Sequence, residues 1–159
     1  MNDRLVQQYG RCYEDFEVGT VYEHRPGRTI TPYDNMSFSL MTQNQHPAHI
    51  DHFYGSQTRF GEPLVVGLLV LSISVGQSVA DISGKAVANL GYDDVRHLAP
   101  TFHGDTIYSE TEVLDKRLSR KTPTTGVVHV RTLARNQRSS PVLSFERHLL
   151  VPVLEGEED

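Results

Sequence analysis

The sequence predicts an α+β fold in which a curved antiparallel sheet surrounds one long, largely apolar helix. The segment PLVVGLLVLSISVGQSVADI begins at residue 63 and carries no charge between Glu62 and Asp81, as expected for a helix buried on most of its sides. Five strand-like segments follow the helix, and one strand-like region precedes it. Such a helix must be covered, and a curved sheet is the natural covering element.

Composition and charge exclude several classes of protein. Of the 159 residues, 22% are charged and 38% are hydrophobic, so we expect a single globular domain over residues 1–159. The net charge of -5 disfavours nucleic-acid binding. The apolar segment falls short of the ~20 residues that a membrane span needs, and it contains Gly67 and Gly76, so we expect no membrane partner. A single cysteine, Cys12, and no apolar signal-like stretch in residues 1–8 favour a cytoplasmic location.

The first elements are short. Residues 1–19 form a mostly polar leader, and its expected packing contacts are Tyr13, Phe16 and Val18. Residues 20–31 alternate imperfectly around a Pro26-Gly27 turn signal, which predicts one or two short strands. Thr31 as N-cap, Pro32 in the first turn and Asp34 three residues after the cap then predict a helix that ends near residue 42.

The remaining elements follow the loop QNQHPAHID, residues 43–51. Residues 52–63 read as a short helix or turn that Gly61 and Pro63 close, and the long helix ends near Ser83-Gly84. The strands expected after it are residues 86–90, 92–98, 106–118, 126–136 and 142–151. Residues 152–159 form an acidic tail. One strand region, a helical pair joined by a polar loop, and a run of antiparallel strands make up the hot-dog architecture.

The polar loop and the start of the long helix resemble the MaoC-like dehydratase family, which includes R-specific enoyl-CoA hydratases. The family pattern is similar to T-G-D-x-N-P-x-H-x-D, and residues 42–51 read TQNQHPAHID. The family segment in which a glycine opens the central helix is matched by PLVVGLLV, with Gly67 as that glycine. The resemblance covers residues 13–151 and departs at two positions, because the family's catalytic aspartate is Asn44 here and its asparagine is His46.

The resemblance implies hydration or dehydration of an acyl-CoA thioester. Adding water needs a base at C3, an acid at C2 and donors to the charge that develops on the thioester oxygen. By resemblance, the catalytic residues are His49 as the main acid–base group, Asn44 as a holder of water or substrate, and Gly67 as a backbone N–H donor, with Val66 beside it as a substrate contact. Coenzyme A is part of the substrate, and no other cofactor is expected.

The residue that performs the second proton transfer is not determined, because Asn44 has a carboxamide, which takes up no proton at neutral pH. Three alternatives remain. His49 performs both transfers, His46 or Asp51 replaces the missing carboxylate, or the protein no longer hydrates. The segments VANLGYDDV and FHGDT are similar to a subgroup of mesaconyl-CoA and methylmalyl-CoA dehydratases, which favours the first two alternatives and implies a branched, dicarboxylic acyl group.

Basic residues and histidines suggest further contacts. Arg59 and Arg96 are candidates to pair with a distal substrate carboxylate, and a basic cluster in residues 116–121 is a candidate for the phosphates of coenzyme A. The histidines at 46, 49 and 52 are spaced like metal ligands, but Pro47 breaks the helix that would align them, so we expect no metal site.

The sequence thus predicts an acyl-CoA hydratase or dehydratase. The alternatives are a hot-dog acyl-CoA thioesterase and a non-catalytic acyl-CoA-binding subunit. Because a single hot-dog unit exposes a sheet edge and half a binding groove, we also expect a homodimer or a higher homo-oligomer.

Overall fold

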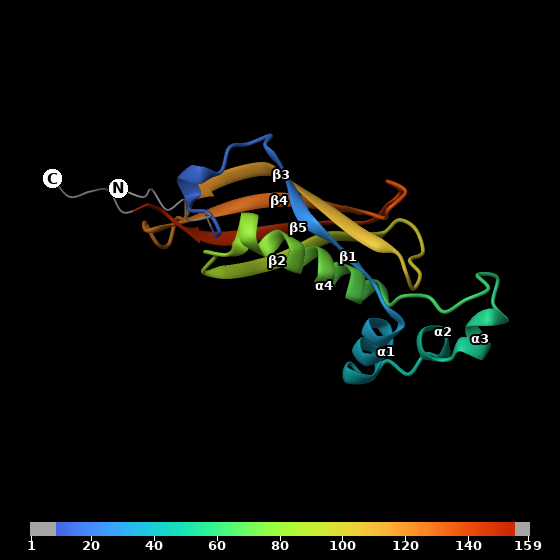
Figure 1. Ribbon diagram of the computed structural model, residues 1–159. Coiled ribbons are helices and arrows are strands. Elements are labelled where there is room, and N and C mark those ends of the chain that lie inside the picture. Colours follow the sequence, from blue (N-terminus) through green and yellow to red (C-terminus); the bar gives the residue numbers. More distant parts are fainter. Residues whose placement is uncertain (1–8, 155–159) are drawn as a thin grey trace, which may run out of the picture.

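The computed structural model describes residues 9–154 and contains a five-stranded antiparallel sheet in the order β1-β3-β4-β5-β2 (Figure 1). The strands are β1 Val21–Thr29, β2 Ala88–His97, β3 Thr106–Leu118, β4 Thr125–Arg135 and β5 Pro141–Pro152. The helices are α1 Pro32–Met41, α2 Pro47–Ile50, α3 His52–Ser56 and α4 Gly67–Ser78. A 3-10 turn, Tyr13–Asp15, precedes β1, and a π-helical turn, Val79–Ser83, continues α4.

The long helix α4 lies along one face of the curved sheet, and α1, α2 and α3 form a lobe beyond its N-terminal end (Figure 1). This is the α+β arrangement that the sequence predicts. Most of the predicted leader is described, whereas residues 1–8 and the end of the acidic tail, residues 155–159, lie outside the described part of the chain.

Several predicted elements are confirmed. β3 has the predicted bounds, and α1 begins with the predicted capping box, in which Thr31 Oγ1 accepts the Asp34 N–H at 3.2 Å and Asp34 Oδ2 accepts the Thr31 N–H at 2.8 Å. Residues 20–31, predicted as one or two short strands, contain the single strand β1, and Pro26 and Gly27 lie inside it where the pairing with β3 shifts between His24 and Arg28. A bulge on an edge strand tolerates the missing proline N–H. The two strands predicted within residues 86–98 are one irregular strand, β2, over Ala88–His97.

As predicted, α4 is buried or partly buried on most of its sides, but a stripe formed by Leu68, Ser72 and Gly76 is exposed. Its buried residues face the sheet and are Leu69, Val70, Ser74 and Ser78, whereas Leu68 is 57% exposed. One sheet covers one side of a helix, so the other apolar side needs another partner. Residues 64–66 are extended, and the helix itself begins at Gly67. Val18 in the leader is exposed and makes no core contact, unlike the buried Phe16.

Two apolar clusters form the core. One contains Ile30, Val65, Val66, Leu69, Val70, Ile107, Ala134, Val142, Leu143 and Phe145, and the other contains Phe16, Ile82, Val113, Val128, Val130, Leu149 and Val151. A buried polar layer lies between them, since His24 joins Asp81 at 2.8 Å and Thr111 at 2.8 Å, and Thr111 joins Thr132 at 2.9 Å. Burial lowers the pKa of His24, although the Asp81 carboxylate opposes this effect. A neutral His24 therefore donates to Asp81 and accepts from Thr111.

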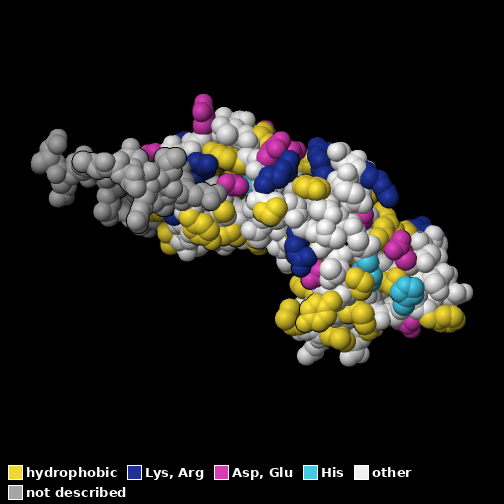
Figure 2. All heavy atoms as spheres, viewed as in Figure 1, with side chains coloured by type: hydrophobic (Ala, Val, Ile, Leu, Met, Phe, Trp, Pro, Cys, Tyr) yellow, Lys and Arg dark blue, Asp and Glu magenta, His cyan; other side chains and the backbone are white. Residues whose placement is uncertain are grey.

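The helix α1 has an inverted distribution of side chains. Its buried residues, Asn35 and Ser39, are polar, while its exposed face carries the apolar side chains of Tyr33, Met36, Leu40 and Met41. Figure 2 shows hydrophobic side chains gathered over this helix. The inner face therefore serves hydrogen bonding, and the outer face resembles a surface that another molecule covers. No helix within residues 9–154 is long and apolar enough to cross a membrane.

Candidate active site

A pocket of about 580 Å³ opens where the polar loop meets the start of α4. Four of the predicted site residues line it, namely Asn44, His49, Val66 and Gly67. The rest of its wall is mostly apolar and consists of Phe60, Leu64, Val65, Leu68, Val70, His97, Leu98, Ala99, Pro100, Thr101 and Val142. The structure thus brings together a histidine, a carboxamide and the first turn of a helix, which come from residues 44–67 of the sequence.

Asn35 holds this arrangement together, and sequence reasoning did not identify it. Its side chain is fully buried, and its Oδ1 accepts the Val66 N–H at 2.9 Å. Its Nδ2 lies 3.1 Å from the His49 carbonyl, 3.0 Å from the Leu64 carbonyl and 3.0 Å from His103 Nε2. One carboxamide therefore joins α1 to the polar loop of residues 43–51 and to the start of α4. An asparagine is a poor helix former, so its place inside an amphipathic helix was the available signal.

His103 takes part in this hub as an acceptor. Because Asn35 Nδ2 can only donate, His103 Nε2 presents a lone pair to it. Burial lowers the pKa of His103, with nearby Glu62 opposing this effect and His52 adding to it. A neutral His103 is the form that preserves the contact.

The backbone N–H groups of the three residues before α4 all have hydrogen-bond acceptors. The Leu64 N–H donates to the Ala48 carbonyl at 2.9 Å, and the Val65 N–H donates to the Thr101 carbonyl at 2.9 Å. The Val66 N–H donates to Asn35 Oδ1, and the N–H of Gly67, the first residue of α4, makes no hydrogen bond to another residue within 9–154. The first N–H groups of a helix lack intrahelical acceptors and lie at the positive end of its dipole. Gly67 therefore presents a fixed donor at the pocket wall.

The His49 side chain has a defined tautomer. Its Nδ1 lies 2.8 Å from the Leu64 carbonyl oxygen, which can only accept, so Nδ1 carries the proton in this contact. In the neutral ring, Nε2 then holds a lone pair. The half-buried His49 can therefore act as a proton acceptor in the pocket while Nδ1 fixes its orientation.

Asn44 has a structural role as well as a position in the pocket. Its Oδ1 accepts the His46 N–H at 3.2 Å, and its own N–H donates to the Ser39 carbonyl at 2.8 Å. The Nδ2 group makes no hydrogen bond to any residue within 9–154. A donor is therefore available for a water or a substrate oxygen.

His46 and Asp51 serve as helix caps outside the pocket. His46 Nδ1 accepts the Ala48 N–H at 3.1 Å at the start of α2, and Asp51 Oδ1 accepts the Tyr54 N–H at 2.9 Å at the start of α3. Both side chains are exposed. Pro47 begins α2 and does not interrupt a helix. In the described part of the chain, no group of three or more His, Cys, Asp or Glu side chains could hold a metal ion.

The two predicted arginines do not line the pocket. Arg59 is exposed, and its guanidinium lies 4.7 Å from the ring centre of Phe60, a lining residue, so Arg59 stands at the edge of the pocket. Arg96 pairs with Asp94 at 2.7 Å on an exposed part of β2. The basic cluster of residues 116–121 lies at the opposite end of the sheet, where Lys116 Nζ donates to the Tyr13 carbonyl.

His97 is a pocket residue that sequence reasoning missed. It ends β2, and a Cβ atom added to Gly67 would lie 2.4 Å from His97 Cε1 and 2.7 Å from Nδ1. The ring therefore lies directly against the start of α4. Because neighbouring residues of a strand point to opposite faces, the choice of Arg96 from the sequence selected the wrong face.

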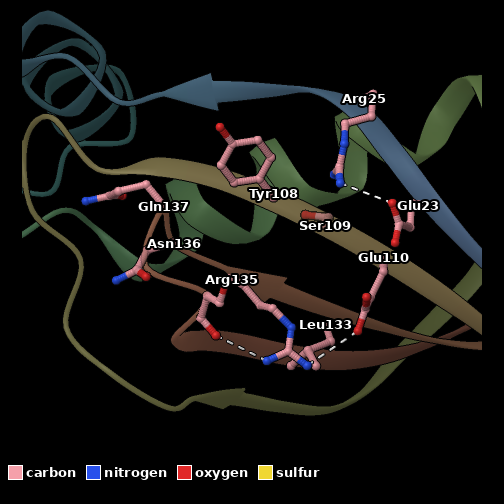
Figure 3. A pocket seen from close by; sticks show the side chains of 10 residues that line it. Glu23, Arg25, Tyr108, Ser109, Glu110, Leu133, Arg135, Asn136 and Gln137 are labelled. Carbon is pink, nitrogen blue, oxygen red and sulfur yellow. Dashed lines mark hydrogen bonds and ion pairs between the residues drawn. The ribbon is translucent and has the colours of Figure 1, made fainter.

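A second hollow of about 360 Å³ lies over β1, β3 and β4 (Figure 3). In it Arg25 pairs with Glu23 at 3.1 Å, and Arg135 lies 3.5 Å from Glu110. Both guanidinium groups already have carboxylate partners, so this hollow offers an anionic ligand little uncompensated charge.

Comparison with known proteins places this geometry in context. The family described as "MaoC like domain" matches residues 15–134. A curated relative named mesaconyl-CoA hydratase, from Cereibacter sphaeroides, is 32% identical over 142 residues, which are 89% of this chain and 41% of that protein. The chain therefore spans about two fifths of the length of this relative.

Solved structures agree with the fold. A putative MaoC domain protein dehydratase from Chloroflexus aurantiacus superposes with a TM-score of 0.90 at 28% identity, over 99% of this chain and 44% of that chain. A protein from Mycobacterium tuberculosis described as having a double hot-dog fold gives a TM-score of 0.83 at 26% identity, over 94% of this chain and 46% of that chain. The hot-dog fold predicted from the sequence is thereby confirmed.

Proposed function

Because the chain belongs to the MaoC-like domain family, we propose that it adds water to, or removes water from, the C2–C3 bond of an acyl-CoA thioester. The observation that carries this proposal is the pocket in which His49, Asn44 and the Gly67 N–H meet. These groups supply a base, a polar holder of water and a donor to the thioester oxygen, which are needs of this reaction.

His49 is the base in this proposal. With Nδ1 held by the Leu64 carbonyl, Nε2 of the neutral ring can take a proton from a water molecule that attacks C3. Asn44 Nδ2 can donate to the oxygen of that water and hold it in place. In the dehydration direction the protonated His49 returns the proton to the leaving hydroxyl group.

The Gly67 N–H binds the thioester oxygen. Charge gathers on this oxygen as water adds to C3, and a fixed donor at a helix N-terminus stabilises that charge more strongly than the uncharged ground state. The loss of one such donor typically lowers kcat by about 10²–10³. The absence of a side chain at Gly67 leaves room for the His97 ring beside the first turn of α4.

We further propose a short, branched or dicarboxylic acyl group such as that of mesaconyl-CoA. The support is the name of the relative from Cereibacter sphaeroides, the apolar wall of the pocket, and Arg59 at its edge beside Phe60. Arg59 is the cation that could pair with a distal carboxylate.

A homodimer is part of the proposal. β2 is an edge strand of the sheet, and exposed apolar side chains lie on it and beside it, namely Leu68, Leu90, Tyr92, Val95 and Leu98. An exposed apolar edge favours pairing with another strand. A second copy paired along β2 would cover this surface and the free side of α4, and the apolar face of α1 is a further surface that a second copy could cover.

A coupled assay tests the function. The purified chain is mixed with crotonyl-CoA and with mesaconyl-CoA, and the enoyl-thioester absorbance and the release of free thiol are followed together. Hydration is expected as loss of absorbance without thiol, and the loss should disappear in His49→Gln. Release of thiol would instead identify a thioesterase. Tight acyl-CoA binding without either signal would identify a non-catalytic binding subunit.

A further inference from the structure

The proposed hydration needs a group that protonates C2, and the pocket contains a suitable side chain. Among the described residues that line it, His49 and His97 are the two with imidazole side chains, whose ring nitrogens can both accept and donate a proton. His46 and Asp51, which the sequence suggested as replacements for the missing carboxylate, lie outside the pocket and cap α2 and α3.

The position of His97 suits contact with the substrate. Its ring lies against Gly67, and within residues 9–154 neither ring nitrogen has a hydrogen-bond partner. The side chain is exposed, so it can exchange protons with solvent. By contrast, His49 Nδ1 donates a hydrogen bond to the Leu64 carbonyl.

The position of the thioester gives His49 and His97 different roles. With the thioester oxygen on the Gly67 N–H, the adjacent carbon chain begins beside the His97 ring. C2 is bonded to the thioester carbon and is therefore the reacting carbon next to Gly67, whereas C3 lies one bond farther away. We propose, on the basis of the hydratase function above, that His97 is the general acid that protonates C2.

The step balances in atoms and charge. His49 Nε2 removes a proton from water while the water oxygen forms a bond to C3. The electrons of the C2–C3 double bond shift and place negative charge on the thioester oxygen, next to the Gly67 N–H. The carbonyl then re-forms as C2 takes a proton from the His97 imidazolium. His49 ends protonated and His97 ends neutral, and proton exchange with solvent restores both.

Three variants of the full chain test this role. His97→Ala removes the acid, His97→Phe keeps a ring without a proton, and His148→Gln changes a histidine that pairs with Asp93 on β2, outside the pocket. We expect kcat for crotonyl-CoA hydration to fall by about 10²–10⁴ in both His97 variants and to stay unchanged in His148→Gln. Binding of butyryl-CoA, which cannot be hydrated, should remain.

Two readouts separate acid catalysis from packing. Because an imidazole can donate to C2 only in its protonated form, the wild-type rate should fall as the pH rises, and this fall should be absent in His97→Ala. Because the side chain is exposed, added imidazole should restore activity to His97→Ala, in proportion to the imidazolium concentration, but not to His97→Phe.

Full activity in His97→Phe, or a fall at high pH that persists in His97→Ala without imidazole rescue, would overturn the assignment and leave the hydratase function standing. A wild-type chain that hydrates neither crotonyl-CoA nor mesaconyl-CoA would instead remove the hydratase function, and the role of His97 with it.

Discussion

Asn35→Ala tests the hub that assembles the site. The Leu64 carbonyl would keep its contact with His49 Nδ1, but the buried Val66 N–H would lose the acceptor that it has in the described chain. A buried donor left unpaired costs about 1–3 kcal/mol, and each of the two lost contacts to carbonyls contributes about 0.5–1.5 kcal/mol. The free energy of unfolding should therefore fall by about 2–6 kcal/mol. For a chain of this size, Tm should fall by about 4–24 °C.

Urea unfolding and thermal denaturation measure the effect, and hydration kinetics below the new Tm show whether the pocket survives. Asn136→Ala is the matched control, because its Oδ1 accepts two N–H groups in the turn after β4, where water can replace it. The control should lose less than about 1 kcal/mol. If Asn35→Ala destabilises the protein no more than this control does, Asn35 is not the element that holds the loop to α4.

Three further predictions follow from the structure. Gly67→Ala places a methyl group against the His97 ring, so kcat for hydration should fall by about 10² or more, while Tm should barely change because the exposed ring can move aside. Thr31→Ala removes the cap of α1 and should cost about 1 kcal/mol in urea unfolding. Burial lowers the pKa of His24, so the unfolded chain binds a proton that the folded chain resists. Stability is then full above about pH 6.5 and falls below it by up to ~1.4 kcal/mol per pH unit, a slope that His24→Asn should reduce in urea titrations.

Local patterns predicted the elements well. The capping box at Thr31 and the strand at residues 106–118 depend on neighbours in the sequence, and both are confirmed. Pro26 and Gly27 gave a turn signal because the same residue types occur in turns and in bulges of edge strands. Only the pairing with β3 distinguishes a turn from a bulge here. The exposed side of α4 could not be foreseen, because an apolar helix in one chain does not reveal which molecule covers it.

The site residues that belong to a continuous sequence motif could be predicted. Those that folding brings together from distant segments could not. Asn44, His49, Val66 and Gly67 belong to continuous stretches that resemble a family pattern, and they meet in one pocket. Their roles in catalysis stay predictions until assayed. Asn35 and His97 come from a helix and from a strand end far away in the sequence. Their importance depends on the distances that folding creates.

The hydrogen bonds of the loop explain how its charge could differ from the family pattern without loss of the fold. Asn44 Oδ1 accepts the His46 N–H, and an aspartate oxygen could accept the same donor, so this position requires an acceptor and not a charge. The acceptors of His46 and Asp51 likewise serve as caps, which ties those side chains to stability. In the proposed reaction, proton transfer is then assigned to rings with a nitrogen free of structural hydrogen bonds. Within the described pocket those rings are His49, through Nε2, and His97.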